Sequence, residues 1–468
     1  MAELKIEKTA IPGLLIIDLD VRGDNRGWFK ENWQRQKMID LGLPDFGPVQ
    51  NNVSFNATRG VTRGFHAEPW DKLISVAAGR IFGAWVDLRE GPTFGTVVTV
   101  EHGPERAVFV PSGVGNAFQV LEGGTAYSYL VNDHWSPAAK DSYTFVNLAD
   151  PTLAVAWPIP LSEGELSEAD RNHPALAEVR PVPAKRTLII GAGGQLGRAL
   201  QALLPDAIAL TRAECDLADP EALEKIDWRS VGAVINAAAY TAVDAAETEE
   251  GRRQAWQVNV HAVGRLVEKA REHRLPLVHV SSDYVFDGTR ELHDEDEPFA
   301  PLGVYGQTKA AGDALVQSWP RHYLLRTSWV VGDGKNFIAT MASLADRGIA
   351  PSVIDDQHGR LTFAVDLAKA AVDLLAGGKP YGTYNVSCDG PVRTWADLAA
   401  AVFVARGRSA DDVTRVSTEE YGQDKNLAPR PRHSALDLTK AKAAGLTLPD
   451  GDQALADYLA ALEVDGGS

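Results

Sequence analysis

Two different patterns of apolar residues divide this 468-residue chain near Pro181 and Pro183. Before these prolines, short runs rich in Val, Ile, Phe and Tyr follow one another between Gly, Pro and Asn turns. After them, short apolar runs alternate with amphipathic segments of helical period. Because a chain of this length is expected to form more than one domain, the change of pattern predicts two, residues 1–182 and 183–468.

The two patterns predict different folds. Many short strands at close spacing, with almost no helical period, favour an all-β sandwich or barrel of the jelly-roll type. Strands that alternate with helices are typical of an α/β Rossmann fold, a doubly wound parallel sheet with helices on both faces. The sequence therefore predicts a multidomain protein, all-β first and α/β second.

Composition restricts the class of protein. A content of 45% hydrophobic and 23% charged residues is ordinary for a soluble globular protein. The net charge of −17 argues against non-specific nucleic-acid binding but leaves room for an anionic small ligand beside a few arginines. The two cysteines, Cys215 and Cys388, are too few for a disulfide framework and lack metal-site spacing. With no visible signal peptide or membrane-length apolar run, we expect a cytoplasmic protein without a membrane partner.

A glycine-rich turn opens the second domain, in TLIIGAGGQLGRALQALL. Gly191, Gly194 and Gly197 lie between a predicted strand and a predicted helix, where the backbone can approach a pyrophosphate at the helix N-terminus. A tight turn without a ligand gives the same string, but the flanking elements favour a dinucleotide. The next strand ends at Thr211 and Arg212 without a carboxylate for the ribose of NAD. NADPH is therefore the expected cofactor. The alternatives are that the domain uses NADH, or that Arg212 is a plain surface residue.

Ser282, Tyr305 and Lys309 form a second group of polar residues, in SSDYVFDG and VYGQTKAAGD. The first segment reads as the end of a buried strand. Tyr305 and Lys309 are four apart and share one face of a predicted helix, where an ammonium favours the phenolate form of tyrosine. The group suits proton transfer to a carbonyl oxygen while hydride reaches the carbonyl carbon. A surface Tyr–Lys pair that arose by chance is the alternative.

The order of motifs in the second domain resembles the short-chain dehydrogenase/reductase superfamily in its extended form. In detail it is similar to dTDP-4-dehydrorhamnose reductase, over about residues 185–468. The segments that carry the resemblance are CDLADP, VINAAAYTAVDAAE, WQVNVHAVGRL, SSDYVFDG, YGQTK, LLRTSWVVGDGKNF, VIDDQHGRLT and APRPRHSALD. The resemblance implies Ser282, Tyr305 and Lys309 as the catalytic set, with serine where many members carry threonine.

The same resemblance implies binding residues. Besides the glycines, Arg212, Tyr305 and Lys309, the residues implied at the cofactor are Gln195, Leu196, Asp216, Leu217, Ala237, Ala238, Ala239 and Asn259. The residues implied at the sugar nucleotide are Thr241, Asp244, Ser282, Asp283, Trp329 and Arg430. Read by itself, Arg430 between two prolines is a rigidly presented cation apt for a diphosphate, or else a salt-bridged loop arginine.

The first domain resembles dTDP-4-dehydrorhamnose 3,5-epimerase, a metal-free jelly roll of the cupin kind, over about residues 5–175. The segments concerned are DNRGWFKEN, QNNVSFNATRGVTRGFH, WDKLI, VDLREGPTFG, TAYSYL, ADPTLAVAWP and LSEAD. The chemistry is removal of protons from carbons that flank a ketone, followed by reprotonation from the opposite face. The resemblance implies His66 as the base, oriented by Asp170, and Tyr129 as the acid. Lys72 would stabilise the enolate.

Substrate contacts in the first domain are also implied by the resemblance. They are Arg26, Glu31, Gln50, Asn52, Arg63 and Asn116. Asn116 stands where the family usually has histidine and Trp135 where it usually has tyrosine, and the loop from His66 to Lys72 is short. Without the resemblance, His66 would be read as a hydrogen-bonded barrel histidine and Tyr129 as a strand residue. No metal is expected, because no HxH pair with a following Glu lies near His66.

These expectations combine into one hypothesis, a fusion of two enzymes that act in sequence to make dTDP-L-rhamnose. The first half would epimerise dTDP-4-dehydro-6-deoxyglucose, and the second would reduce its 4-keto group with NADPH. A dTDP-sugar is the expected ligand, and a homodimer the expected assembly. One alternative is a reductase whose cupin half only binds ligand, dimerises or epimerises a single centre. Another is a cofactor-sensing regulatory subunit.

Overall fold

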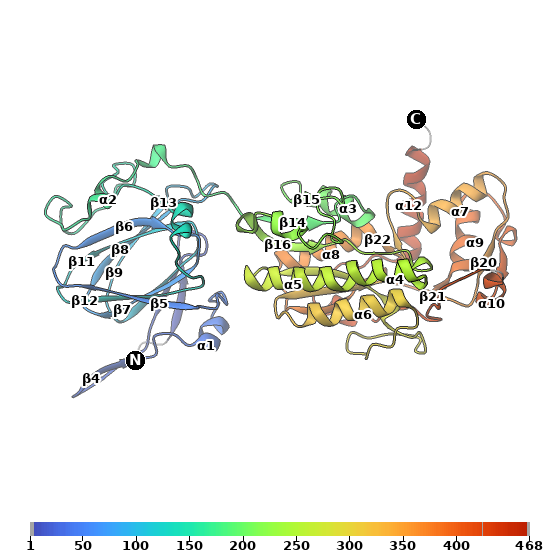
Figure 1. Ribbon diagram of the computed structural model, residues 1–468, viewed down its shortest axis with the longest axis horizontal. Helices are drawn as coiled ribbons and strands as arrows, with labels where there is room; N and C mark the ends of the chain where they lie inside the picture. Colours follow the sequence, from blue (N-terminus) through green and yellow to red (C-terminus); the bar gives the residue numbers. More distant parts are fainter. Residues whose placement is uncertain (1–3, 424, 466–468) are drawn as a thin grey trace. The chain divides into compact units, whose positions relative to one another are not determined.

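The computed structural model describes residues 4–423 and 425–465. The chain folds into two compact units, residues 1–184 and 185–468 (Figure 1). The first is an all-β unit and the second an α/β unit, as the change of sequence pattern predicts. Within the described residues, no helix combines the length and the apolar character needed to cross a membrane.

The N-terminal unit contains two antiparallel sheets whose side chains share one core. The six-stranded sheet runs in the order β1 (Lys5–Lys8), β2 (Leu15–Asp18), β10 (Arg106–Val110), β7 (Lys72–Ala78), β12 (Thr125–Val131) and β5 (Gln50–Asn56). The five-stranded sheet runs in the order β13 (Thr144–Phe145), β6 (Thr62–Ala67), β11 (Val114–Val120), β8 (Ile81–Asp87) and β9 (Val97–His102). Ile74 and Val108 of the first sheet pack with Trp85 and Phe118 of the second, so the core lies between the sheets.

A few elements of this unit lie outside the two sheets. They are the hairpin β3 (Val21–Asp24) and β4 (Gly27–Lys30), the short helices α1 (Arg35–Asp40) and α2 (Glu168–Arg171), and the 3-10 turns η1 (Ala138–Ser142) and η2 (Leu176–Glu178). Figure 1 shows β4 projecting from the body of the unit. Helix α2 begins at Ser167, whose side-chain oxygen accepts a hydrogen bond from the backbone N–H of Asp170 at 3.1 Å. This cap fixes the position of Asp170.

The C-terminal unit is built on a six-stranded parallel sheet. Its order is β15 (Ile208–Leu210), β14 (Arg186–Ile190), β16 (Val231–Asn236), β17 (Leu277–Ser282), β18 (His322–Thr327) and β23 (Gly382–Asn385). Helices α5 (Ala262–Glu272) and α6 (Val304–Gln317) contribute to the core on one face of the sheet. Helices α3 (Gln195–Leu203) and α8 (Ala364–Ala376) contribute to the core on the other face.

The order of the strands reverses beside β14, the first strand of the unit. In doubly wound sheets the ligand binds at such a switch point, beyond the carboxyl ends of the strands. The sheet has one strand fewer beyond β15 than the Rossmann order 3-2-1-4-5-6 requires. The reason is local, because the chain between β15 and β16 forms only the short turns η3 (Ala222–Lys225) and η4 (Trp228–Ser230).

The remaining elements of this unit pack beside the sheet. Its helices are α4 (Glu249–Trp256), which continues into the π-helical turn η6 (Gln257–His261), α7 (Phe337–Asp346), α9 (Trp395–Ala405), α10 (Thr418–Gly422), α11 (Thr439–Ala443) and α12 (Gly451–Asp465). Two-stranded sheets pair β19 (Val330–Val331) with β22 (Thr362–Phe363), β20 (Ser352–Ile354) with β25 (Thr414–Val416), and β21 (His358–Gly359) with β24 (Arg393–Thr394). Helices α7, α9 and α12 share a core that includes Phe403 and Leu459.

Candidate active sites

In the N-terminal unit, strand β6 and helix α2 bring His66 and Asp170 together. Nε2 of His66 lies 2.8 Å from Oδ1 of Asp170, and the two side chains are 34% and 7% exposed. Burial alone would raise the pKa of Asp170, but the hydrogen bond and charge of His66 hold the pKa below its ordinary value. A carboxylate therefore fixes one ring nitrogen of an accessible imidazole, which leaves the other nitrogen for a substrate proton.

Lys72 begins strand β7 and forms a buried ion pair with Glu68. Its Nζ lies 2.7 Å from Oε2 of Glu68 and 5.5 Å from the ring centroid of Tyr129. Burial lowers the pKa of Lys72, and the carboxylate of Glu68 opposes that change. Burial and the charge of Glu68 raise the pKa of Tyr129, so its phenol keeps the proton that a general acid must give. The sequence did not single out Glu68, although it lies between His66 and Lys72.

His173 is a second residue that the sequence did not single out. Its ring packs edge-on against His66, with centroids 5.6 Å apart, and stacks on Phe145 at 4.6 Å. Its Nδ1 lies 4.0 Å from Oδ1 of Asp170 and has no hydrogen-bond partner among the described residues. His66, Asp170 and His173 offer ligand atoms within 4.8 Å of one another, so they could hold a metal ion. The absence of a metal stays a prediction.

Some of the implied substrate residues lie near Tyr129. Asn52 is its cross-strand partner on β5, and the charge of Arg63 acts on its hydroxyl. Gln50 donates a hydrogen bond from its Nε2 to Oδ1 of Asn52 at 2.9 Å. Asn116 lies opposite His66 in the sheet, but its buried amide is hydrogen-bonded to the hydroxyl of Tyr127.

Arg26 and Glu31 are not brought to this group within one chain. Arg26 is 84% exposed at the turn of the projecting hairpin and binds Asp24. Glu31 follows the hairpin and binds Lys37, with its Oε2 2.6 Å from the lysine Nζ. Both residues are held by sequence neighbours, which motif matching cannot reveal.

In the C-terminal unit, a cavity of about 1410 Å³ lies at the switch point and is lined by the glycine-rich turn. Gly191 has a φ of +88°, and a Cβ at this position would lie 2.7 Å from the backbone nitrogen of Ala238. A Cβ at Gly197 would lie 2.2 Å from the carbonyl oxygen of Gly191. Gly194 is the N-cap of α3 and supplies no side-chain cap, so the helix N-terminus remains available to a phosphate. These residues fit a dinucleotide.

Most of the implied cofactor residues line this cavity. They are Gly191, Gly194, Gln195, Leu196, Arg212, Asp216, Leu217, Ala237, Ala238, Ala239, Tyr305 and Lys309. Arg212 is 84% exposed, and its Nε lies 3.3 Å from Oδ2 of Asp216. Gly197 and Asn259 are outside the lining. Asn259 instead exchanges hydrogen bonds with the backbone of Tyr240 at 2.9 and 3.1 Å, so it holds the loop that lines the cavity.

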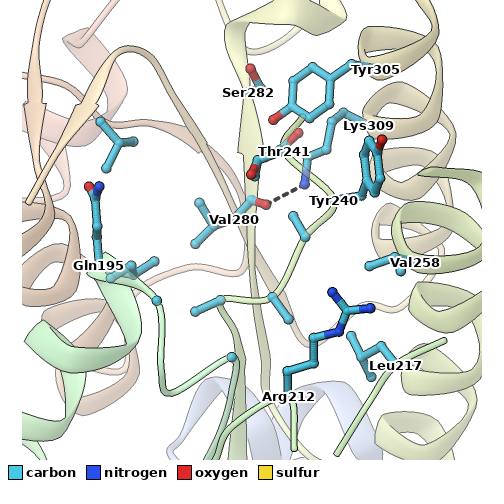
Figure 2. Close-up of a pocket in the computed structure, with 18 of the residues that line it drawn as sticks. Gln195, Arg212, Leu217, Tyr240, Thr241, Val258, Val280, Ser282, Tyr305 and Lys309 are labelled. Atoms are coloured by element: carbon cyan, nitrogen blue, oxygen red, sulfur yellow. Dashed lines mark hydrogen bonds between the residues drawn. The ribbon is translucent and has the colours of Figure 1, made fainter. Parts of the chain in front are cut away.

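Ser282, Tyr305 and Lys309 line the same cavity, where β17 ends beside α6 (Figure 2). The Nζ of Lys309 donates a hydrogen bond to the carbonyl oxygen of Val280 at 2.7 Å. Burial lowers the pKa of Lys309 to about 8, while the charge of Asp313 opposes the shift. The local geometry thus agrees with the helical spacing of Tyr305 and Lys309.

One electrostatic expectation was wrong. The pKa of Tyr305 is raised, because burial and the nearby carboxyl of Asp283 outweigh the hydrogen bond with Ser282. Burial has the largest effect on this pKa, and the depth of a side chain in the fold is not visible in the sequence. Tyr305 is accordingly a protonated phenol, the form that donates to a carbonyl oxygen during reduction. Asp283 is itself fully buried at the cavity, and burial raises its pKa to about 6.

Thr241 and Asp283 line the cavity with Trp329, whereas Asp244 and Arg430 do not. Trp329 adopts a φ of +45° and stacks on Trp395 with centroids 3.8 Å apart. Trp395 also lines the cavity, and no sequence motif pointed to it. Arg430 forms an ion pair with Asp244, with Nη2 and Oδ1 2.8 Å apart, which is the salt-bridged arrangement left open as an alternative.

Comparisons with known proteins place both units in families. Residues 185–464 match the family model described as the RmlD substrate binding domain, and residues 8–178 match dTDP-4-dehydrorhamnose 3,5-epimerase. The chain is 55% identical over 180 residues to an RmlC homolog from Streptococcus pyogenes, covering 37% of this chain and 90% of that protein. It is 37% identical over 295 residues to dTDP-4-dehydrorhamnose reductase from Aggregatibacter actinomycetemcomitans, covering 59% of this chain and 99% of that protein.

A solved structure extends the comparison of the C-terminal unit. The dTDP-4-dehydrorhamnose reductase from Bacillus anthracis, in complex with NADP, is 30% identical with a TM-score of 0.54. The match covers 59% of this chain and 98% of that one. The chain therefore belongs to both families, with a dTDP-4-dehydrorhamnose 3,5-epimerase unit followed by a dTDP-4-dehydrorhamnose reductase unit.

Proposed function

We propose that this bifunctional enzyme of dTDP-L-rhamnose biosynthesis carries out two consecutive reactions on one sugar nucleotide. The N-terminal unit epimerises dTDP-4-dehydro-6-deoxyglucose at C3 and C5, and the C-terminal unit reduces the 4-keto group with NADPH. One observation supports this most strongly, namely that each unit has its own set of acid–base residues. His66 and Asp170 pair in the first unit, and Tyr305 and Lys309 line the cavity of the second.

The epimerisation uses the proton states found at the first site. His66 takes the proton from the carbon beside the ketone. The C–H electron pair forms the C=C bond of the enolate, and the carbonyl π pair moves onto the oxygen. Asp170 stabilises the imidazolium that results, and the ammonium of Lys72 stabilises the enolate. Tyr129, whose raised pKa keeps it protonated, returns a proton to the opposite face.

The reduction uses a protonated phenol at the second site. When bound along the glycine-rich turn, NADPH would supply the hydride for the carbonyl carbon. Ser282 and Tyr305 line the same cavity and hold the ketone oxygen, and Tyr305 gives it the proton that makes it a hydroxyl. Arg212, exposed at the cavity, supports NADPH over NADH because its guanidinium can bind the 2′-phosphate.

The product of the complete chain tests the two reactions together. The purified protein is given dTDP-4-dehydro-6-deoxyglucose and NADPH, and the sugar is identified by NMR. Wild type should yield the L-rhamnosyl nucleotide, and Tyr305→Phe should stop at epimerised 4-keto sugar. A D-configured product from wild type would exclude the epimerase role and favour a cupin half that only binds or dimerises.

Exposed apolar residues support a homodimer formed by the N-terminal unit. Phe29 on the projecting hairpin is 71% exposed, and Val53 and Phe55 on the edge strand β5 are 65% and 67% exposed. Val53 and Phe55 are two positions apart on one strand and therefore share a face, and grouped exposed apolar side chains are uncommon on a free surface. A second copy of this chain would cover them and could receive Arg26 and Glu31 at its sugar-nucleotide site.

The finer fold assignments and the cellular location also belong to the proposal. The two antiparallel sheets with a shared core support a cupin-like jelly roll. The helices on both faces and the reversed strand order support a doubly wound Rossmann fold. Cys215 and Cys388 are buried free thiols, as expected in the reducing cytoplasm where we place the enzyme.

A further inference from the structure

A buried histidine lies next to the catalytic lysine, and neither the sequence motifs nor the proposed chemistry uses it. His279 is in the middle of β17 and is 1% exposed. Its Nδ1 lies 3.0 Å from Nδ2 of Asn236 on β16. Its Nε2 lies 3.5 Å from Nζ of Lys309 on α6. The imidazole therefore bridges a neighbouring strand and the lysine.

The position of the proton on this imidazole follows from its neighbours. The backbone N–H of Ala238 donates a hydrogen bond to Oδ1 of Asn236 at 3.1 Å, which fixes the orientation of the amide. The Asn236 Nδ2 group therefore faces the ring and donates to Nδ1 of His279. A neutral imidazole that accepts at Nδ1 carries its hydrogen on Nε2. The N–H of His279 is thus turned toward Lys309.

The imidazole stays neutral. Burial and the positive charge of Lys309 hold the pKa of His279 well below its ordinary value. A neutral ring with hydrogen on Nε2 cannot accept a hydrogen bond from an ammonium at that atom. It can donate one to the lone pair of an uncharged amine, so it stabilises the deprotonated form of Lys309.

Other groups also act on Lys309, and they differ in direction. Burial favours the neutral amine and the carboxyl of Asp313 favours the ammonium. The carbonyl oxygen of Val280 accepts a hydrogen bond from Nζ and is available to either form. The titratable groups around the lysine are His279 on β17, Asp283 after it, Tyr240 on the loop after β16, and Tyr305 and Asp313 on α6.

We propose that His279, held in one tautomer by Asn236, is a positioning residue that makes Lys309 the proton source for Tyr305 between turnovers. Tyr305 loses its proton to the product oxygen, and the phenolate takes one from the Lys309 ammonium. The amine that remains accepts a hydrogen bond from Nε2–H of His279 and then regains a proton from water. The proposal rests on the reductase reaction described above, and it assigns that reaction a residue outside the Ser–Tyr–Lys set.

The pH dependence of the reductase kcat tests this role. Because Lys309 must be an ammonium to give a proton, activity falls on the alkaline side as the lysine deprotonates. His279→Leu removes the donor to the neutral amine of Lys309. We therefore expect the alkaline limb of the kcat–pH profile to shift to higher pH by about one pH unit. The added apolar contact would by itself lower the pKa of the lysine, so desolvation cannot produce an upward shift.

Two further variants separate the hydrogen bond from a packing effect. The glutamine of His279→Gln can accept a hydrogen bond from Asn236 with its carbonyl and donate one to Lys309 with its amide. The alkaline limb of its kcat–pH profile should therefore return to the wild-type position. His322→Leu removes another buried histidine, whose Nδ1 bonds to the carbonyl oxygen of Trp319, and should leave the limb unchanged. The proposal would be overturned if the alkaline limbs of the kcat–pH profiles coincided for wild type and His279→Leu. It would also be overturned if His279→Leu and His279→Gln shifted that limb equally.

A direct measurement protects the test against variants that fail to fold. In the wild-type chain labelled with ¹⁵N-histidine, NMR should find the proton of His279 on Nε2, identified by the resonances that His279→Gln loses. A proton on Nδ1 would overturn the proposal whatever the variants do. Failure of the reductase assignment can be distinguished from failure of the proposed role of His279. In the first case, the wild-type chain would oxidise no NADPH at any pH.

Discussion

The ammonium of Lys72 and the carboxylate of Glu68 lie 2.7 Å apart, with only 6% and 12% of the two side chains exposed. A buried pair of this kind is costly to break, because the remaining charge has no partner and little water. The pair also presents a cation beside Tyr129, whose ring centroid is 5.5 Å from the lysine Nζ. In the proposed epimerisation, stability and enolate chemistry would therefore depend on the same two side chains.

Breaking this ion pair should affect folding and epimerisation differently. Glu68→Gln should lower the free energy of unfolding by about 3–5 kcal/mol, because it leaves Lys72 buried without its counter-charge. The double variant Glu68→Gln with Lys72→Met should recover most of that loss, since no charge remains. It should not recover epimerase activity, which needs the ammonium. Thermal unfolding and deuterium exchange into the sugar measure the two effects, and a double variant with normal epimerisation would exclude the role of Lys72.

The His66–Asp170 pair should make stability depend on pH in acid. The pKa of Asp170 is lower in the folded state than in the unfolded chain. The contribution of this carboxylate to the free energy of unfolding is therefore fully present above the unfolded pKa of about 3.9. The contribution is lost as pH falls through the lower, folded value. Wild type should therefore exceed Asp170→Asn in stability near neutral pH, and the gap should close below about pH 4. A gap that stays constant down to pH 2 would contradict this account.

Gly191 should be essential for the reductase and irrelevant for the epimerase. Alanine there would combine a φ of +88° with a Cβ 2.7 Å from the backbone of Ala238, so the turn at the cofactor must move. We expect Gly191→Ala to lower NADPH affinity by at least tenfold and to leave sugar deuteration intact. Gly193→Ala is the matched control, because its added Cβ would meet only Thr211 at 3.9 Å. Equal NADPH affinities for the two variants, measured by fluorescence titration, would refute the assigned role.

Arg212 should distinguish the two nicotinamide cofactors. Because a hydrogen bond to a charged group contributes about 1.5–3 kcal/mol, Arg212→Ala should raise the KM for NADPH by roughly 10- to 100-fold. The KM for NADH should change little, since NADH has no 2′-phosphate. Steady-state kinetics with both cofactors decide the matter. A proportional rise in both KM values would indicate that Arg212 shapes the cavity without contacting the phosphate.

The parts of the site that the sequence predicted are mostly local. The spacing of Tyr305 and Lys309 and the glycine turn are set by neighbouring residues, so helical period and turn chemistry reveal them. His66 and Asp170 are 104 positions apart, and only the family resemblance connected them. His173 and Trp395 escaped notice because each packs against a ring that is distant in sequence. Glu68 escaped notice because its role depends on the burial of its ion pair with Lys72, which the sequence does not show.

The fold was likewise predicted in class but not in detail. Alternating strands and helices indicated a parallel sheet, whereas the missing strand beyond β15 results from a segment that forms only short turns. The raised pKa of Tyr305 has the same origin, because the depth of a side chain in the fold cannot be read from its neighbours in sequence.

The central claim is that His66 and Tyr305 serve separate reactions on one sugar. The most direct measurement places the chain in D₂O with dTDP-4-dehydro-6-deoxyglucose and without NADPH, and records deuterium by NMR. Wild type and Tyr305→Phe should both incorporate deuterium at C3 and C5, and His66→Asn should incorporate none. Deuteration by His66→Asn at the wild-type rate, or its absence from wild type, would contradict the account.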